Sequence, residues 1–214
     1  MSPQLPLPLP PATPKLSRAD FLVAPANAEA VAFIDLWPNW TVASAALYGP
    51  SGSGKSHLAG AWAANALVMQ AAAIDPDVPL QPIVIEDVDG VRASLKRDGA
   101  LFSLLERATR GAPVLLTGLE PPAAWDVALP DLASRFAALL AFPLWAPDDA
   151  LLAALARKLF TDRQLTVPDA VIARMLRSLE RTPAAVRAFV AEADARALAE
   201  KKPVSVSLVQ ELMR

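Results

Sequence analysis

The residue types best suited to chemistry in this chain of 214 residues lie in one short stretch. It fits the pattern GxxxxGK[ST] and consists of Gly49, Pro50, Ser51, Gly52, Ser53, Gly54, Lys55 and Ser56. Glycines let backbone N–H groups turn inward around phosphate oxygens, a lysine reaches the β- and γ-phosphates, and a final hydroxyl binds Mg²⁺. The stretch therefore predicts a loop that holds the phosphates of a nucleotide, with Ser56 as a ligand of the metal ion. His57 follows directly, and we place it beside the nucleotide as a packing or capping residue rather than a catalyst.

Two adjacent acids, Glu86 and Asp87, follow the β-branched run Ile83–Ile85. Acids at the end of a buried strand can orient Mg²⁺ and an attacking water molecule. The alternative is an ordinary solvated strand end, because two acids in a row are less specific than the glycine-rich loop. We assign Glu86 and Asp87 to catalysis and Glu86 also to the metal ion.

The elements that must position these residues read as strands alternating with helices. Three short apolar runs, at 45–48, 83–85 and 114–116, are typical of buried parallel strands. A helical pattern with Leu101, Leu104 and Leu105 separates the last two runs and ends near Gly111. The charge-free stretch 57–74 is short for a membrane span, and we interpret it as an alanine-rich helix. The fold class is therefore α/β, with a parallel sheet flanked by helices.

The pattern changes near residue 146, after which only helices are expected. Helical patterns cover about 149–163, a segment after Pro168, a segment from about Pro183, and a short segment at 204–213. The chain thus divides into an extended proline-rich arm (1–18), an α/β nucleotide-binding domain (19–146) and a small all-α lid domain (147–214). In the arm, proline fixes φ and removes backbone donors, so an extended conformation is expected.

The composition argues against several classes of function and of metal site. The net charge is −2, with 20 Lys and Arg against 22 Asp and Glu, so no basic character favours nucleic acid as the main partner. The chain has no cysteine, which fits a reducing cytoplasm and excludes thiolate metal sites. Its single histidine argues against a histidine-based metal or triad site. No secretory signal is visible, and no membrane association is expected.

On its motifs the chain resembles the replication initiator DnaA and its relatives among the AAA+ ATPases. The stretch Tyr48–Leu58 is similar to their P-loop, and the segment from Phe21 to Ala30 is similar to their adenine-contacting stretch. The run Leu129–Phe136 (LPDLASRF) resembles the box that holds the arginine finger, here Arg135. Arg181, at the start of RTPAAVRAFV, is placed by the resemblance at the sensor 2 arginine of the lid.

Within this family the chain most resembles the Hda-like regulatory inactivators of DnaA, which lack the DNA-binding domain of DnaA. It implies a protein that binds ADP or ATP with Mg²⁺ and stimulates ATP hydrolysis by DnaA through Arg135, supplied in trans. It also implies binding to the DNA sliding clamp through a QLxLxL motif formed by Gln4, Leu5, Leu7 and Leu9. DNA would then be reached only indirectly, through the clamp, and formation of a homodimer is left open.

Three departures from the family pattern suggest weak intrinsic hydrolysis. Glu86 and Asp87 stand where the family has Asp-Asp or Asp-Glu, and Leu119 stands where DnaA has an acid. Thr117 retains a polar group at the sensor 1 position beside the nucleotide. The interval 75–82 is too short for the usual connecting helix, so one element of the sheet is expected to be trimmed. Two alternatives remain, namely an initiator- or loader-type ATPase that hydrolyses its own ATP, and an adaptor whose nucleotide is structural.

Overall fold

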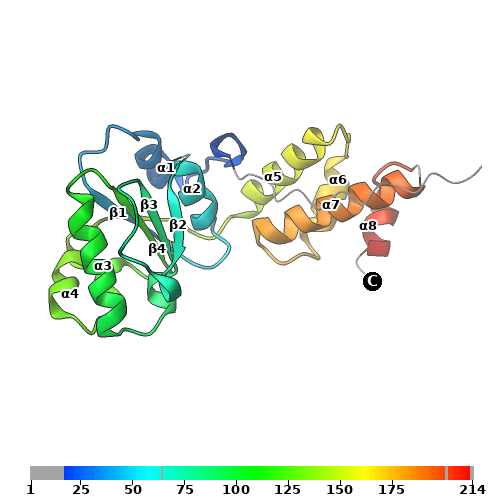
Figure 1. The fold of residues 1–214 in the computed structure, drawn as a ribbon. Coiled ribbons are helices and arrows are strands. Elements are labelled where there is room, and N and C mark those ends of the chain that lie inside the picture. The colour runs from blue at the N-terminus through cyan, green and yellow to red at the C-terminus, as the bar shows by residue number, and fades with distance from the viewer. Residues whose placement is uncertain (1–16, 64, 201, 213–214) are drawn as a thin grey trace, which may run out of the picture.

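The computed structural model describes residues 17–63, 65–200 and 202–212. Its centre is a sheet of five parallel strands in the order β2-β3-β4-β1-β5 (Figure 1). The strands are β1 (Ser44–Tyr48), β2 (Leu67–Gln70), β3 (Ile83–Glu86), β4 (Val114–Gly118) and β5 (Leu140–Pro143). The predicted α/β fold class with a parallel sheet is therefore confirmed.

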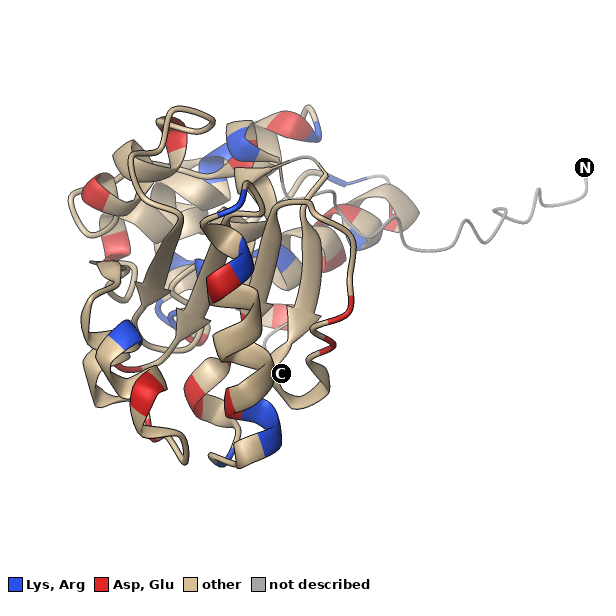
Figure 2. Ribbon diagram, turned by 60° about the vertical axis from the view of Figure 1, so that its left-hand side comes forward, with Lys and Arg blue, Asp and Glu red and all other residues tan. Residues whose placement is uncertain are grey.

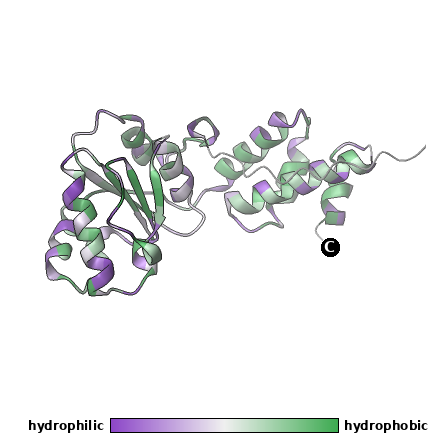
Figure 3. Ribbon diagram, viewed as in Figure 1, coloured by the Kyte–Doolittle hydropathy of each residue, from purple (hydrophilic) through white to green (hydrophobic). Residues whose placement is uncertain are grey.

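Helices cover both faces of the sheet. The helices α1 (Ala28–Asp35) and α2 (Lys55–Trp62) share a core with one face, whereas α3 (Leu95–Ala108) and α4 (Pro130–Ala137) pack on the other. All five residues of β4 are buried, which explains why its sequence is apolar without alternation. Figure 3 shows the strands mostly in hydrophobic colours, while the helices combine hydrophobic and hydrophilic residues.

The prediction of a single helix over residues 57–74 is wrong. The helix α2 ends at Trp62, Ala63 is extended, and the chain forms β2, which pairs in parallel with β3. β2 is an edge strand with alternating half-buried and exposed residues, so its few apolar side chains could not be distinguished from one face of a helix. The edge strand β5 was also not predicted.

The short connection between β2 and β3 was expected to remove one element of the sheet, but it removes only the connecting helix. Its described residues form only a 3-10 turn, η2 (Ala71–Ala73), before the loop that leads to Ile83. The usual helix is thus missing from this connection, as its length indicates. The sheet itself is not shortened, because all five strands pair.

The C-terminal helices have a separate core. They are α5 (Asp149–Asp162), α6 (Asp169–Leu176), α7 (Pro183–Glu200) and α8 (Val206–Leu212), close to the segments expected from the sequence. Leu155, Ile172, Met175 and Val190 lie buried among them. Figure 1 shows these helices as a second lobe beside the sheet, and the boundary assigned at residue 146 stays a prediction. In the part of the chain that the structure describes, no helix has the length and apolar character needed to cross a membrane.

Candidate nucleotide site

The glycine-rich loop connects β1 to α2 and has the backbone geometry that its sequence requires. Gly49, Gly52 and Gly54 have φ of 143°, 75° and 102°, a region that side chains with a Cβ rarely adopt. A Cβ on Gly49 would lie 2.0 Å from the carbonyl oxygen of Leu144, so only glycine fits there. These conformations let the loop turn tightly into the first turn of α2, and the N-terminus of a helix is a favourable place for an anion.

Two buried side chains of this loop, Lys55 and Ser53, face different environments. Lys55 is buried, and its Nζ donates to the carbonyl oxygens of Gly49 at 2.7 Å and Pro50 at 3.0 Å. Burial lowers the pKa of the Lys55 ammonium, while the charges of Asp87, Asp89 and Glu86 act in the opposite direction. The Oγ of Ser53 is buried and has no hydrogen-bond partner within the described part of the chain. A phosphate oxygen would satisfy this hydroxyl and pair with the ammonium.

The acids after β3 lie next to the loop, where the sequence places them. Asp87 has a left-handed backbone, with φ 55°, and its N–H donates to Thr117 Oγ1 of β4 at 3.2 Å. Glu86 accepts a hydrogen bond from Gln70 Nε2 of β2 at 2.7 Å. The structure thus brings Glu86, Asp87 and Thr117 together at the carboxyl end of the sheet, the edge at which α/β proteins bind ligands.

Asp89 is a residue that the sequence reasoning missed. Its carboxylate accepts hydrogen bonds from the backbone N–H of Leu119 at 2.8 Å and of Glu120 at 2.8 Å. The carbonyl oxygens of Gly118 and Leu119 in turn accept from the N–H of Gly49, at 3.2 and 3.1 Å. Asp89 therefore fixes the turn that supports the first glycine of the loop. The available signal was an acid two residues after the Glu86-Asp87 pair, directly before Gly90.

A pocket that is partly open to solvent extends from the loop toward the C-terminal helices. Phe21 and Asn27 line one side of it, and side chains of α5 and α7 line the other. Asn27 precedes α1 but does not cap it with its side chain. Its amide instead accepts from the N–H of Ala24 at 2.9 Å and donates to the carbonyl of Leu22 at 3.1 Å, which fixes the pocket wall.

The structure does not bring Arg181 to this pocket. Its side chain is 72% exposed and pairs with Asp149 at 3.3 Å, beside a different groove between α5 and α6. The arginine that lines the pocket is Arg187, half-buried in α7 one turn after Pro183. Arg181 lies outside the helix, whereas Pro183 and Arg187 are four positions apart and share one face. That spacing was the signal that could have selected Arg187.

His57 faces the pocket and the segment before α1. Its Nε2 lies 3.0 Å from the carbonyl oxygen of Ser17, and its Nδ1 lies 3.1 Å from Nη2 of Arg187. The Phe21 ring meets it edge-on, with ring centroids 5.1 Å apart. Burial lowers the pKa of His57, and the positive charge of Arg187 lowers it further. This environment agrees with a packing residue rather than a catalyst.

Arg135 lies on α4, over the face of the sheet opposite α2. Its guanidinium pairs with Glu106 of α3 and stands over the Phe102 ring, 4.5 Å from the ring centroid. The Arg135 side chain is 37% exposed. Because α2 and α4 cover different faces, Arg135 does not line this chain's own pocket.

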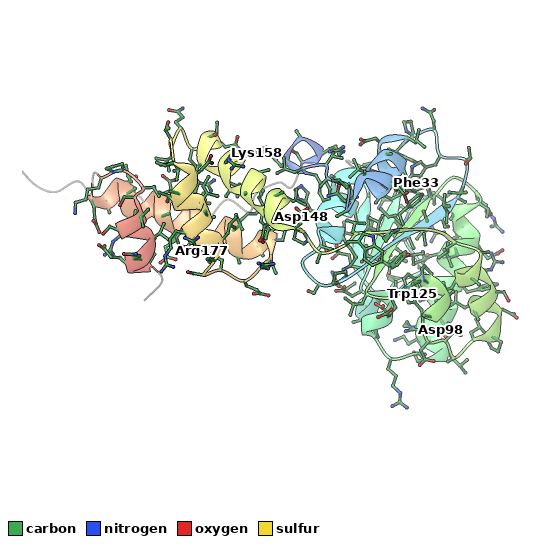
Figure 4. The ribbon with its side chains drawn as sticks, turned by 180° about the vertical axis from the view of Figure 1, so that it is seen from behind. Phe33, Asp98, Trp125, Asp148, Lys158 and Arg177 are labelled. Atoms are coloured by element: carbon green, nitrogen blue, oxygen red, sulfur yellow. The ribbon has the colours of Figure 1, made fainter. Side chains whose placement is uncertain are left out.

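The position of α4 depends on a buried ion pair that the sequence did not reveal. Asp98 of α3 is fully buried, pairs with Arg97 at 2.8 Å and accepts from the N–H of Leu129 at 3.0 Å. Arg97 donates to the carbonyl of Asp126 at 2.6 Å, so the two residues fasten the loop that leads into α4. Figure 4 shows Asp98 near Trp125, away from the C-terminal helices.

The residues of the predicted clamp-binding motif, Gln4, Leu5, Leu7 and Leu9, lie outside the described residues.

Comparison of whole structures identifies the fold. Domain III of the replication initiation protein DnaA from Thermotoga maritima is similar, with TM-score 0.76 and 18% sequence identity over 92% of this chain and 94% of that one. The chain has the AAA+ fold. AMPPCP-bound DnaA from Aquifex aeolicus matches with TM-score 0.65 and 17% identity over 78% of this chain and 62% of that one. Thermotoga maritima RuvB (R170A) matches with TM-score 0.70 and 14% identity over 92% of this chain and 71% of that one.

At these identities the comparisons establish the AAA+ fold and leave the activity open. The sequence matches no protein-family model and no curated protein. DnaA and RuvB are both similar to this chain, so the comparisons show the fold that the two share and do not select the Hda-like group.

Proposed function

We propose that the chain is a nucleotide-binding regulator with an AAA+ fold, which takes ADP or ATP in the pocket beside the glycine-rich loop. The observation that supports this most directly is the pair formed by the unsatisfied Ser53 hydroxyl and the buried Lys55 ammonium. The hydroxyl has no hydrogen-bond partner and the ammonium has only neutral carbonyl partners, so a phosphate oxygen would satisfy the first and neutralise the second. Both groups lie on the loop whose glycines allow phosphate to approach. The base would lie against Phe21 and Asn27, and Arg187 would face the nucleotide from α7.

The residue types also fit Mg²⁺ bound together with the nucleotide. Among the described residues no group of three or more His, Cys, Asp or Glu could hold a metal ion. Mg²⁺ commonly takes one or two protein ligands and completes its shell with water and phosphate oxygens. Ser56 and Glu86 would hold the ion, which would neutralise charge on the phosphates when bound. Asp87 and Thr117 would orient polar groups beside it.

The regulatory role would be exerted on DnaA. Arg135 is partly exposed on α4 and does not line this chain's own pocket, so it is suited to act on a neighbouring protein's nucleotide. An arginine supplied in trans can accelerate phosphoryl transfer by roughly 10³- to 10⁵-fold. The motif at Gln4, Leu5, Leu7 and Leu9 would bind the sliding clamp. Figure 2 shows basic and acidic residues interspersed over the ribbon, which agrees with reaching DNA only through the clamp.

A second candidate is a protein that hydrolyses its own ATP. The hydrogen bond between Asp87 and Thr117 favours it, because it places two polar groups next to the phosphate loop. Against rapid hydrolysis, Glu86 is already engaged by Gln70. A homodimer of this chain would be an additional way to bring Arg135 to a second nucleotide site.

Nucleotide binding is tested by thermal unfolding of the purified chain with ADP, ATP and no nucleotide. A ligand at 100 times its Kd that binds only the folded state stabilises it by about 2.7 kcal/mol, which raises Tm. Lys55→Ala should lose that rise, while Lys96→Ala, an exposed lysine on α3, should keep it. Equal Tm values for the wild type with and without nucleotide would contradict the proposal. Hydrolysis of ATP by the chain alone, and by DnaA with the chain and the clamp on DNA, separates the two candidates.

A further inference from the structure

Residues 119–129 connect β4 to α4 and are fixed at their start to the turn η3 (Val88–Gly90). This turn begins directly after Asp87, one of the two acids assigned to the nucleotide. The N–H groups of the first two residues of the loop both donate to the carboxylate of Asp89, each at 2.8 Å. The start of the loop is therefore held by the same turn that follows the acids.

The end of this loop is held by Arg97, which is buried in the first turn of α3. Its guanidinium donates to the carbonyl oxygens of Val88, at 3.3 Å, and of Val91, directly after η3. It also donates to the carbonyl oxygen of Asp126 in the loop, at 2.6 Å. A planar guanidinium has five donors in a fixed geometry, so Arg97 can bond to both segments at the same time.

Asp98, the next residue of α3, holds the backbone directly before α4. Its carboxylate is fully buried and uses both oxygens. Oδ1 pairs with Arg97 at 2.8 Å, and Oδ2 accepts from the N–H groups of Ala128 and Leu129, the latter at 3.0 Å. Leu129 occupies the N-cap position of α4 and has no side-chain oxygen that could cap the helix. The carboxylate of Asp98 thus fixes from outside the point at which α4 begins.

The ion pair formed by Arg97 and Asp98 has a specific advantage over apolar packing. Burial of two charges costs hydration free energy, and an apolar pair of similar size often stabilises a fold equally well. Apolar side chains could not form the hydrogen bonds that join η3 to the start of α4. The pair therefore favours one fixed position of α4.

Arg135 lies in the second turn of α4, so its position follows from where this helix begins. The helix has 8 residues and is about 12 Å long. On its inner side Phe136 is buried and meets the ring of Trp125 edge-on, with ring centroids 5.0 Å apart. Trp125 belongs to the loop that Arg97 holds. A displacement of the loop or of the helix start would therefore displace Arg135 as well.

We propose that Arg97 and Asp98 are positioning residues for Arg135, because together they fix the start of α4 to η3 and so place the Arg135 guanidinium where it reaches a partner's nucleotide. This inference rests on the proposed action of Arg135 on DnaA. Neither Arg97 nor Asp98 lines this chain's own pocket, so their effect on hydrolysis is exerted through α4. Misplacement of a group that acts on the reacting atoms by about 1 Å can lower a rate roughly 10²-fold.

Two conservative variants separate positioning from simple neutralisation of buried charge. Arg97→Lys keeps a positive charge beside Asp98, but a single ammonium cannot reach η3 and the loop together. If the pair only neutralised charge, lysine would replace arginine without loss. Asp98→Asn keeps the shape of the side chain and replaces one oxygen by an NH₂ group, which can only donate. Either Arg97 or the N–H groups before α4 then face a donor.

The first experiment measures ATP hydrolysis by DnaA with the sliding clamp on DNA, titrated with each variant. Arg97→Lys and Asp98→Asn should lower the maximum stimulation about tenfold or more, while the concentration for half-maximal stimulation stays within about twofold of the wild type. Lys96→Ala, an exposed neighbour on α3, is the matched control and should stimulate normally. Full stimulation by Arg97→Lys, or a change in the half-maximal concentration alone, would overturn the inference.

The second experiment observes α4 in the free protein. Because the chain has no cysteine, Ser134→Cys provides a single site for a trifluoromethyl label on the exposed side of α4. Arg97→Lys and Asp98→Asn should shift or split the ¹⁹F line of this label, and Lys96→Ala should leave it unchanged. A label introduced by Ala32→Cys on α1, over the other face of the sheet, should respond to none of the three.

The two experiments together separate this inference from the proposed function. A ¹⁹F line on α4 that neither Arg97→Lys nor Asp98→Asn changes overturns the inference, even if the wild type stimulates hydrolysis. Changed lines with no stimulation by the wild type overturn the proposed action on DnaA and leave only the position of α4. Urea unfolding checks that the variants are folded. Loss of a cooperative transition in both would show that the pair holds the whole domain, and would overturn a specific role toward Arg135.

Discussion

The Nζ of Lys158 donates to the carboxylate of Asp20 at 2.9 Å, across 138 positions of sequence. Asp20 belongs to the turn η1 (Arg18–Asp20), ahead of the sheet, and Lys158 belongs to α5 of the C-terminal helices, where Figure 4 labels it. The same ammonium donates to Asp162 at 2.7 Å, and the hydroxyl of Ser17 donates to Asp20 at 2.7 Å. The pair is thus a direct polar link between the two lobes, beside the pocket that both of them line.

This link gives the first prediction, for Asp20→Asn. The hydrogen bonds from Ser17 and Lys158 lower the pKa of Asp20 from 3.8 to about 2. A carboxylate with a depressed pKa stabilises the folded state above pH 3.8, and this contribution is lost as the pH falls toward 2. Because both side chains are substantially exposed, screening keeps the contribution below about 1 kcal/mol.

Urea unfolding at pH 7 and at low pH provides the measurement. Asp20→Asn should be less stable than the wild type at pH 7, and the difference should shrink toward pH 2. The matched control is Asp77→Asn, in the connection between β2 and β3, which should change little at either pH. If the free energy of unfolding of Asp20→Asn differs from that of the wild type by the same amount at pH 7 and at low pH, the ionised Asp20 carboxylate is not the cause of the difference.

The second prediction concerns the pair formed by Arg135 and Glu106. If Arg135 acts on DnaA, its guanidinium must leave Glu106, so Glu106→Gln should favour the active position. We expect half-maximal stimulation of ATP hydrolysis by DnaA at a concentration about two- to fivefold lower, since such exposed pairs contribute up to about 1 kcal/mol. Arg135→Ala should abolish the stimulation, and Arg110→Ala, past the end of α3, should not affect it.

The assay is ATP hydrolysis by DnaA with the sliding clamp on DNA, titrated with each variant. Clamp binding measured in parallel shows whether Arg135→Ala is still folded and recruited. Stimulation by Arg135→Ala equal to that of the wild type would remove Arg135 from the proposed mechanism, and leave binding of nucleotide untouched.

The third prediction compares two glycines of the α/β lobe. A Cβ on Gly118, at the end of β4, would lie 2.7 Å from the Trp125 ring, whereas a Cβ on Gly60, in α2, would meet nothing within 4 Å. Gly118→Ala should lower the free energy of unfolding by about 1–3 kcal/mol, because the packed indole must shift. Gly60→Ala should raise it by about 0.5–1 kcal/mol through the lower entropy of the unfolded chain.

Denaturant titration of the two variants and the wild type measures whether each free energy of unfolding falls or rises as predicted. The indole of Trp125 also donates to the carbonyl of Glu120 at 2.7 Å, so Gly118→Ala should perturb the turn that Asp89 holds. If Gly118→Ala is as stable as the wild type, the contact between the strand end and Trp125 is looser than described.

The sequence by itself determined the features that depend on local geometry. Gly49 and Gly54 identify the phosphate loop because only glycine tolerates its left-handed backbone. The continuous apolar run of β4 indicates a strand buried on both faces, and the leucines of α3 indicate a helix packed on one face. These patterns were sufficient for the α/β class and for the helical C-terminal lobe.

Only the tertiary structure decided which distant residues meet. The resemblance placed Arg181 beside the nucleotide, but the structure puts Arg187 of α7 in the pocket and leaves Arg181 exposed beside Asp149. The edge strand β2 was misread because it continues the charge-free, alanine-rich stretch that begins in α2, so the whole stretch looked like one helix. The contacts of His57 with Ser17 and Arg187, 40 positions before it and 130 after it, follow from packing that no local pattern encodes.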